Sequence, residues 1–245
     1  DGHQVKLLAN IESNQEVKTL YKFGAEGVGL YRTEFLYLAA SPLPGERELY
    51  ENFKSVVHEM DSKPVVIRTL DIGMDKQFGN VINNDEDNPA LGLRGIRLSL
   101  VNPQLLIDQA KGILRASFYG DVKILYPMIS SVTEIIQANK ILEDAKNDLR
   151  KDQIPFDEEI EVGAMIETPA AAICIDHILK EVDFISIGTN DLIQYLLAVD
   201  RVNENVAHLY QPFHPAVLRS LKNIIRSAED AGIKVSICGE LGGDP

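Results

Sequence analysis

The chain has 245 residues, with 24 lysines and arginines against 37 aspartates and glutamates, which gives a formal net charge of −13. An acidic chain is not typical of proteins that bind nucleic acid or anionic membranes nonspecifically, because such binding needs a basic surface. A hydrophobic content of 45% excludes extended disorder, and two cysteines exclude a disulfide framework, so we expect a cytoplasmic protein. No apolar run approaches the ~20 residues of a membrane span, so we expect no membrane insertion.

Short, nearly continuous apolar runs alternate along the chain with longer amphipathic segments. Such runs are typical of parallel strands that are covered on both faces. The predicted strands are 5–11, 27–33, 65–70, 122–129, 162–167, 184–188 and 234–238. Helices are expected between them. This alternation predicts an α/β fold, and it is compatible with both a (β/α)8 barrel and an open doubly wound sheet.

Three local patterns predict where helices begin. Ser13 with Glu16, and Ser131 with Glu134, have the spacing of a capping box. Asn102 is followed by a proline, which is typical of the first helical position.

Polar side chains follow directly after five of the seven predicted strands. In either parallel architecture these carboxyl ends meet at one face, where active sites lie. We therefore expect most of these residues to share one site. They are Arg32 and Glu34, Arg68 and Asp71, Glu167, Asn190 and Asp191, and Cys238 with Glu240.

Arginines are concentrated in or near these strand-following loops, at positions 32, 68, 94, 97 and 201. A guanidinium group matches phosphate and carboxylate oxygens in two-point geometry. In an acidic protein such a group indicates a small anionic ligand rather than a polymer. The alternative is pairing with nearby acids such as Glu34 and Asp71, and we favour that pairing for Arg97.

Glu167 and Asp191 follow neighbouring predicted strands, and two carboxylates can share a Mg²⁺ ion. The alternative is a general acid/base pair, which we favour less because arginines for an anion lie alongside. The turn from Gly188 to Asp191 precedes a helical run, whose N–H groups can hold phosphate oxygens. It is also compatible with an ordinary turn in which Asn190 or Asp191 is the N-cap.

The two cysteines carry different expectations. Cys238 ends the last predicted strand, where a thiol can act as an acid or nucleophile or be a small buried hydrophobe. Cys174 lies in a helical run after three alanines, and we expect it in the core.

A series of longer motifs runs along the whole chain. The motifs are GVGLYRTEF (27–35), RTLDIG (68–73), NPALGLR (88–94), ETPAAA (167–172), SIGTNDL (186–192), AVDR (198–201) and CGE (238–240). In this order they closely resemble Enzyme I, the phosphoenolpyruvate-protein phosphotransferase family of the bacterial sugar phosphotransferase system. One departure is Met74, which stands where the family has a glycine, two residues before Lys76.

The resemblance implies that residues 1–245 form the phosphoenolpyruvate-binding domain, a TIM-type barrel that mediates homodimerisation in the full-length family. No segment for an eighth strand and helix follows Pro245, so we expect an incomplete barrel with seven of eight strands, truncated at its C-terminus. The resemblance also implies that phosphoryl transfer goes to a histidine on another domain, with release of pyruvate and relay to a phosphocarrier protein. We expect the chain alone to bind substrate without completing this transfer.

The resemblance also implies a role for each matching residue. Arg32, Arg68 and Arg201 would bind the phosphate and carboxylate of phosphoenolpyruvate, with assistance from Arg94. Glu167 and Asp191 would hold Mg²⁺, with Asp191 also beside the substrate. Asn190 would contact the phosphoryl group, and Cys238 would protonate the methylene carbon of the enolate.

Three alternatives stay open. Pyruvate phosphate dikinase and phosphoenolpyruvate synthase share this barrel and chemistry, although segments 198–201 and 208–212 resemble Enzyme I more. The nitrogen-related branch of Enzyme I is not separated from the sugar branch by this segment. A noncatalytic dimerisation or docking module is the alternative from another class of function.

Overall fold

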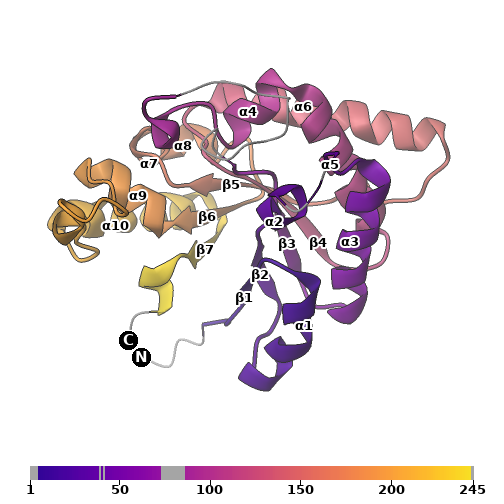
Figure 1. Cartoon of the computed structure of the whole chain (residues 1–245), viewed down its shortest axis with the longest axis horizontal. Coiled ribbons are helices and arrows are strands. Elements are labelled where there is room, and N and C mark those ends of the chain that lie inside the picture. The colour runs from indigo at the N-terminus through magenta and orange to yellow at the C-terminus, as the bar shows by residue number, and fades with distance from the viewer. Residues whose placement is uncertain (1–4, 39, 41, 73–85, 244–245) are drawn as a thin grey trace. The chain divides into compact units, whose positions relative to one another are not determined.

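The computed structural model describes residues 5–38, 40, 42–72 and 86–243 (Figure 1). Met74 and Lys76 lie outside the described residues. The chain divides into two compact units, one of residues 1–125 and 137–161, the other of residues 126–136 and 162–245.

The first unit is built on parallel strands that pair in the order in which they occur in the chain. They are β1 (Ala9–Ile11), β2 (Val28–Tyr31), β3 (Val65–Arg68) and β4 (Val122–Tyr126). Val65 is in register with Val122, and Arg68 with Leu125. All four residues of β3 are buried, as the continuous apolar run predicts for a strand that is covered on both faces.

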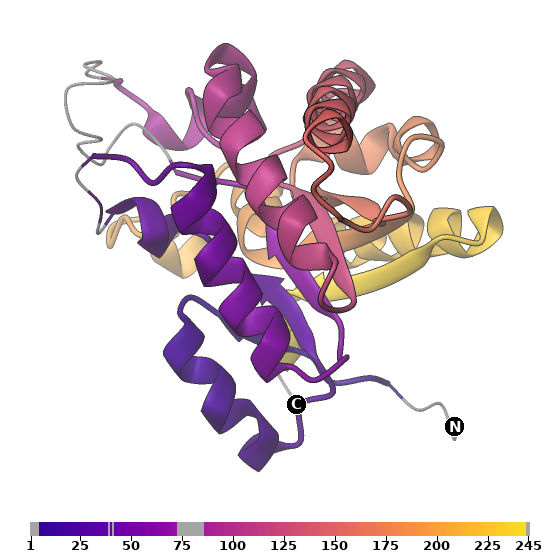
Figure 2. The ribbon, with the colours of Figure 1, turned by 90° about the vertical axis from the view of Figure 1, so that its right-hand side faces the viewer.

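Helices cover the strands of the first unit. They are α1 (Asn14–Leu20), α2 (Glu34–Leu38), α3 (Glu46–Glu59), α4 (Ile96–Val101), α5 (Pro103–Ser117) and most of α6 (Val132–Lys151), with short 3-10 turns η1 (Tyr21–Phe23) and η3 (Pro89–Leu91). Helices α3 and α5 pack side by side, as both views show (Figure 2). Leu49 and Phe53 of α3 and Ile113 of α5 are fully buried. Burial of each such side chain stabilises the fold by roughly 1.5–3 kcal/mol.

At both predicted capping boxes the glutamate side chain bonds back to the serine. The backbone N–H of Ser13 donates to Glu16 Oε1 at 2.8 Å, and that of Ser131 donates to Glu134 Oε2 at 2.9 Å. Helices α1 and α6 each begin at the next residue, because these bonds satisfy N–H groups that the helix itself leaves without partners.

The second unit contains three parallel strands, again paired in chain order. They are β5 (Val162–Ile166), β6 (Phe184–Gly188) and β7 (Lys234–Cys238). The helices of this unit are α7 (Pro169–Ile173), α8 (Ile175–Ile178), α9 (Thr189–Leu197) and α10 (Pro215–Ala231), with 3-10 turns η4 (Ala207–Leu209) and η5 (Glu240–Gly243). Helix α10 packs against α7, α8, α9 and β7.

The strand order decides between the two architectures that the alternation left open. In both units, strands that are neighbours in the sheet are neighbours in the chain, whereas a doubly wound sheet reverses its order at a switch point. The prediction of an α/β fold of the TIM type with seven of eight strands is confirmed. The predicted first strand, 5–11, is too long, and only Ala9–Ile11 pair, since Val5 and Leu7 are exposed and bury nothing there. No helix among the described residues is long and apolar enough to cross a membrane.

A buried polar network lies behind the end of β3. The Gln109 side chain of α5 donates to Thr33 Oγ1 at 3.0 Å and accepts the N–H of Leu70 at 2.9 Å. The Thr33 hydroxyl in turn donates to the carbonyl oxygen of Arg68 at 3.0 Å. Thr33, Leu70 and Gln109 are all buried, so this network holds the backbone from Arg68 to Leu70.

We expect Gln109→Leu to lower the free energy of unfolding by about 3 kcal/mol, because it leaves a buried N–H and a buried hydroxyl without these partners. Urea unfolding followed by circular dichroism measures this change. The matched control is Gln104→Leu on the same helix, where the exposed side chain bonds only to Asp108. Equal, small effects of the two substitutions would contradict a stabilising role of the network.

Candidate functional site

The predicted site residues form two groups, one in each unit, and each group lies at the carboxyl ends of the strands of its own unit. The arginine cluster of the first unit consists of Arg32, Glu34, Arg68, Asp71 and Arg94. The β5–β7 cluster of the second unit consists of Glu167, Asn190, Asp191, Arg201 and Cys238.

Asp71 holds the arginine cluster together. Its carboxylate accepts two hydrogen bonds from Arg94. Nε donates to Oδ1 at 3.2 Å, and Nη2 donates to Oδ2 at 3.0 Å. Arg68, the last residue of β3, pairs with Asp71 at 3.1 Å and with Glu34 at 3.0 Å. The Asp71 side chain is only 2% exposed and that of Arg68 11%. Both guanidinium groups are therefore fixed by buried or nearly buried carboxylates.

Two opposing effects act on the pKa of Asp71. Burial raises the pKa, since it disfavours the charged carboxylate, but the guanidinium groups of Arg68 and Arg94 outweigh burial and hold the pKa below its ordinary value. Asp71 is therefore charged at neutral pH, and its charge keeps both guanidinium groups in place.

Arg32 and Arg97 differ from the other arginines of this unit. Arg32 pairs with Glu12 at 3.0 Å, and both side chains are substantially exposed. The prediction of an acid partner for Arg97 is not met among the described residues, where its guanidinium donates to the carbonyl oxygens of Leu91 and Gly92 at 3.1 and 3.3 Å. These carbonyls lie at the end of the short turn η3, and the Gly92 carbonyl also accepts the backbone N–H of Arg94 at 3.1 Å.

Glu167 directly follows β5 and is 2% exposed. Its Oε1 accepts the backbone N–H of Met128 at 2.6 Å. A Cβ atom at Gly188 would lie 2.5 Å from Glu167 Oε2, so only glycine at the end of β6 leaves room for this carboxylate. The carboxylate is thus seated against the residue that precedes α9.

Asn190 and Asp191 lie in the first turn of α9, whose N-cap is Gly188. The alternative in which Asn190 or Asp191 is the N-cap is therefore contradicted, since the helix begins at Thr189. Asn190 instead accepts the N–H of Glu240 on its side-chain oxygen at 3.1 Å. Asp191 is buried, and its Oδ1 lies 3.6 Å from a guanidinium nitrogen of Arg201.

Cys238 is the last residue of β7, and its side chain is buried. Its Sγ lies 3.4 Å from the Ser186 hydroxyl and 3.5 Å from the carbonyl oxygen of Ile187. The prediction that Cys174 lies in the core is wrong, because this residue is exposed. It stands at the junction of α7 and α8, where the helical path breaks and its side chain leaves the buried face.

Several supporting residues were missed by sequence reasoning. Ser186 and Thr189 lie inside the SIGTNDL motif, so the sequence could have predicted that they lie beside the site residues. Gln109 stands on the buried face of α5, and a polar residue on such a face indicates a buried partner. The bond from the Tyr210 hydroxyl to the Asn190 carbonyl, at 3.3 Å, had no signal, because it joins residues twenty positions apart through a loop.

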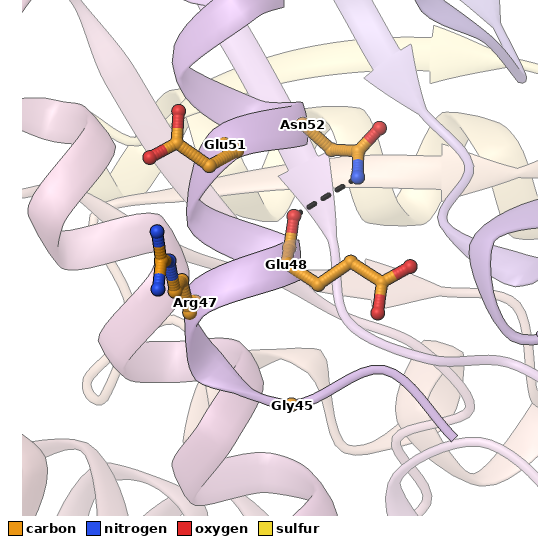
Figure 3. Close-up of a pocket in the computed structure, with 5 residues that line it drawn as sticks. All are labelled: Gly45, Arg47, Glu48, Glu51 and Asn52. Carbon is orange, nitrogen blue, oxygen red and sulfur yellow. Dashed lines mark hydrogen bonds between the residues drawn. The ribbon is translucent and has the colours of Figure 1, made fainter. Parts of the chain in front are cut away.

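A surface hollow of about 420 Å³ lies at the start of α3 (Figure 3). Gly45, Arg47, Glu48, Glu51 and Asn52 line it, and Asn52 donates to the Glu48 carbonyl at 2.9 Å. The lining comes from one helix and the residue before it, and it includes none of the predicted site residues. We assign it no chemistry.

We expect Asp71→Asn to lower the free energy of unfolding at neutral pH by about 3 kcal/mol, because two guanidinium groups lose a buried counter-charge. A carboxylate with a depressed folded-state pKa contributes stability above its unfolded pKa of about 4 and loses it as pH falls through the folded value. The difference in free energy of unfolding between wild type and Asp71→Asn is therefore constant above roughly pH 5 and becomes smaller below about pH 4. Urea unfolding at a series of pH values measures it.

The matched control is Asp148→Asn, which removes the exposed carboxylate that pairs with Lys111. It should change stability little at neutral pH. A difference between wild type and Asp71→Asn that grows as pH falls would contradict the assignment.

Comparisons with known proteins bear on this arrangement. The family model described as "PEP-utilising enzyme, PEP-binding domain" matches residues 1–245. A phosphoenolpyruvate-protein phosphotransferase of Priestia megaterium is 49% identical over 244 residues, covering 100% of this chain and 43% of the relative. The protein of the same name from Geobacillus stearothermophilus is 50% identical over 245 residues, covering 100% of this chain and 42% of the relative. The chain thus spans less than half the length of these relatives.

Solved structures match the fold at low identity. A HpcH/Hpal aldolase/citrate lyase family protein from Burkholderia cenocepacia J2315 aligns with a TM-score of 0.57 at 16% identity, over 97% of this chain and 82% of that one. Citrate synthase SbnG aligns with a TM-score of 0.55 at 16% identity, over 98% of this chain and 79% of that one. These likenesses concern the fold alone, whereas the family model and the nearly half-identical relatives extend over the whole sequence. The chain belongs to the family of phosphoenolpyruvate-binding domains of phosphoenolpyruvate-utilising enzymes.

Proposed function

We propose that this chain is the phosphoenolpyruvate- and Mg²⁺-binding catalytic part of a phosphoenolpyruvate-protein phosphotransferase. The observation that carries the proposal is the continuous match, at nearly half identity, to relatives of that name. In the proposed reaction the phosphoryl group passes to a histidine on a domain outside this chain, pyruvate is released, and a phosphocarrier protein receives the phosphoryl group next.

The arginine cluster supports binding of the substrate's anionic groups. Arg32, Arg68 and Arg94, with Arg201 from the second unit, are the proposed ligands of its phosphate and carboxylate. Phosphoryl transfer depends mainly on charge neutralisation and alignment, and guanidinium groups held in advance supply both without reorganisation. The bonds of Arg68 and Arg94 to Asp71 provide this fixed orientation. Each guanidinium has five N–H donors, so a pairing with carboxylate leaves capacity for ligand oxygens.

Glu167 and Asp191 are the proposed holders of Mg²⁺. Mg²⁺ commonly takes one or two carboxylates and fills its shell with water and substrate phosphate, and this donor set fits it. Among the described residues, no group of three or more His, Cys, Asp and Glu side chains is arranged to hold a metal ion. When bound, the ion would neutralise charge on the phosphoryl oxygens.

The remaining roles fall to Asn190 and Cys238. The Asn190 amide, at the start of α9, is the proposed contact to the phosphoryl group. The Cys238 thiol is the proposed acid that protonates the methylene carbon of the enolate. Its buried position supports this role, because a proton is delivered more selectively where bulk water is excluded.

The wider setting is part of the same proposal. It includes a cytoplasmic location, homodimerisation of the full-length protein and service in sugar transport. Two cysteines in 245 residues support the location, and the names of the relatives support the phosphotransferase role.

We expect titration calorimetry to detect binding of phosphoenolpyruvate to the intact chain. We expect Arg201→Ala to weaken this binding roughly tenfold or more, because the variant loses a charge-assisted contact. Arg201 is the preferred position because its side chain is exposed and its 3.6 Å contact with Asp191 is longer than the ion pairs of Arg68, so its replacement should disturb the fold less. Arg68→Lys provides a second test that keeps the buried positive charge.

The matched control is Arg219→Ala, an exposed arginine on α10. It should bind as the wild type does. Absence of binding by the intact chain would instead favour a docking module.

We expect Mg²⁺ to strengthen phosphoenolpyruvate binding, and Glu167→Gln to abolish this strengthening while binding without Mg²⁺ persists. The amide oxygen of Gln can still accept the Met128 N–H, so the fold should be retained. Calorimetry with and without Mg²⁺ measures the effect, with Glu229→Gln on the exposed side of α10 as the control. An unchanged dependence on Mg²⁺ in Glu167→Gln would rule out this carboxylate as a ligand.

A further inference from the structure

The Cys238 thiol lies between two groups of β6. The Ser186 hydroxyl donates to Sγ at 3.4 Å, and the thiol donates to the carbonyl oxygen of Ile187 at 3.5 Å. Ser186 is 1% exposed and Cys238 is 8% exposed. The contacts follow from the parallel register, which pairs Gly188 with Cys238 and places Ser186 two residues earlier on the adjacent strand.

The backbone around Cys238 is held by the residues that follow β6. The buried Thr189 hydroxyl donates to the Cys238 carbonyl at 3.1 Å, and Asn190 accepts the N–H of Glu240 at 3.1 Å. Gly239 has a φ of +99°, and a Cβ there would lie 2.9 Å from Asn190 Oδ1, so this close approach needs glycine. These bonds fix the backbone at and after Cys238, so only rotation about the Cα–Cβ bond of Cys238 moves the sulfur relative to Ser186.

We propose that Ser186 is a positioning residue for proton transfer by Cys238, and that its hydroxyl stabilises the thiolate that this transfer leaves behind. The inference rests on the proposed role of Cys238. It adds to that role a residue that makes no contact with the substrate and acts only through the sulfur.

The proton transfer shows why Ser186 matters more than the Ile187 carbonyl. The S–H bond breaks and its electron pair stays on sulfur, while the enolate's carbon–carbon π pair forms the new C–H bond, giving the methyl ketone of pyruvate. The bond to Ile187 requires the S–H proton and is lost. The bond from Ser186 goes to the sulfur itself, and it strengthens when the sulfur becomes negative. Ser186 therefore binds the transition state more tightly than the ground state.

Charged groups of the second unit define the rest of the environment. The acids at these strand ends are Glu167 after β5, Asp191 on α9 and Glu240 after β7, and Arg201 is the cation beside Asp191. A neutral hydroxyl donor that faces the sulfur adds no charge that would pair with the substrate or with these acids.

The first test is spectroscopic and needs no substrate. In a Cys174→Ser background, which removes the exposed thiol, the Raman S–H band reports Cys238 alone. We expect Ser186→Ala to broaden this band and move it toward the position of a free thiol. Ser236→Ala is the matched control, because its hydroxyl contacts the Ile185 carbonyl instead. An S–H band that Ser186→Ala leaves unchanged would overturn the proposal.

The second test follows exchange of the methyl protons of pyruvate with D2O by NMR, in the presence of Mg²⁺. We expect Ser186→Ala to lower kcat roughly tenfold, the factor for loss of one hydrogen bond to a charged group, with KM unchanged. Ser236→Ala should match wild type. Equal kcat values for the two serine variants would overturn the proposal.

Cys238→Ser separates this inference from the function on which it rests. If Cys238→Ser exchanges as fast as wild type, the proposed role of Cys238 is wrong, and so is the positioning role of Ser186. If Cys238→Ser is inactive while Ser186→Ala is not slowed, only the role of Ser186 fails.

Discussion

The parallel pairing of successive strands is the constraint on which every feature of the candidate site depends. Apolar burial sets where each strand runs, and the parallel direction then places the residue after each strand at the same end of its unit. Arg68, Glu167 and Cys238 have little else in common, yet each ends or directly follows a strand. Site residues that end or follow strands can therefore be scattered along the sequence and still be gathered, within each unit, by the pairing of the strands.

Acids and arginines have linked roles in the first unit. As it stands, the pairing of Asp71 with Arg68 and Arg94 is an ion-pair network of the kind that the alternative interpretation foresaw. Anion binding and ion pairing do not exclude each other, because a carboxylate can hold a guanidinium in place while other N–H donors stay directed elsewhere. A buried charge network is costly to desolvate and gains most where orientation matters. That cost is consistent with a binding site rather than with stabilisation alone.

In the second unit, small and neutral groups hold the site side chains in place. Gly188 makes room for the Glu167 carboxylate, and Gly239 permits the close approach of Asn190. Ser186 and Thr189 hold Cys238 through sulfur and through the backbone. These contacts are made by backbone and hydroxyl groups, so they add no side-chain charge beside the proposed sites of the metal ion and the anion.

The sequence by itself determined the alternation of strands and helices, the capping boxes at Ser13 and Ser131, and the residues that follow each strand, because these depend on local periodicity and short-range hydrogen bonds. The family resemblance also came from the sequence, since ordered motifs such as SIGTNDL need no coordinates. Only the tertiary structure decided the chain order of the strands, the bidentate pairing of Arg94 with Asp71, the exposure of Cys174 and the contact between Ser186 and Cys238. These features join residues that are distant in the chain, and their geometry depends on strand register and on packing density. No local pattern encodes that information.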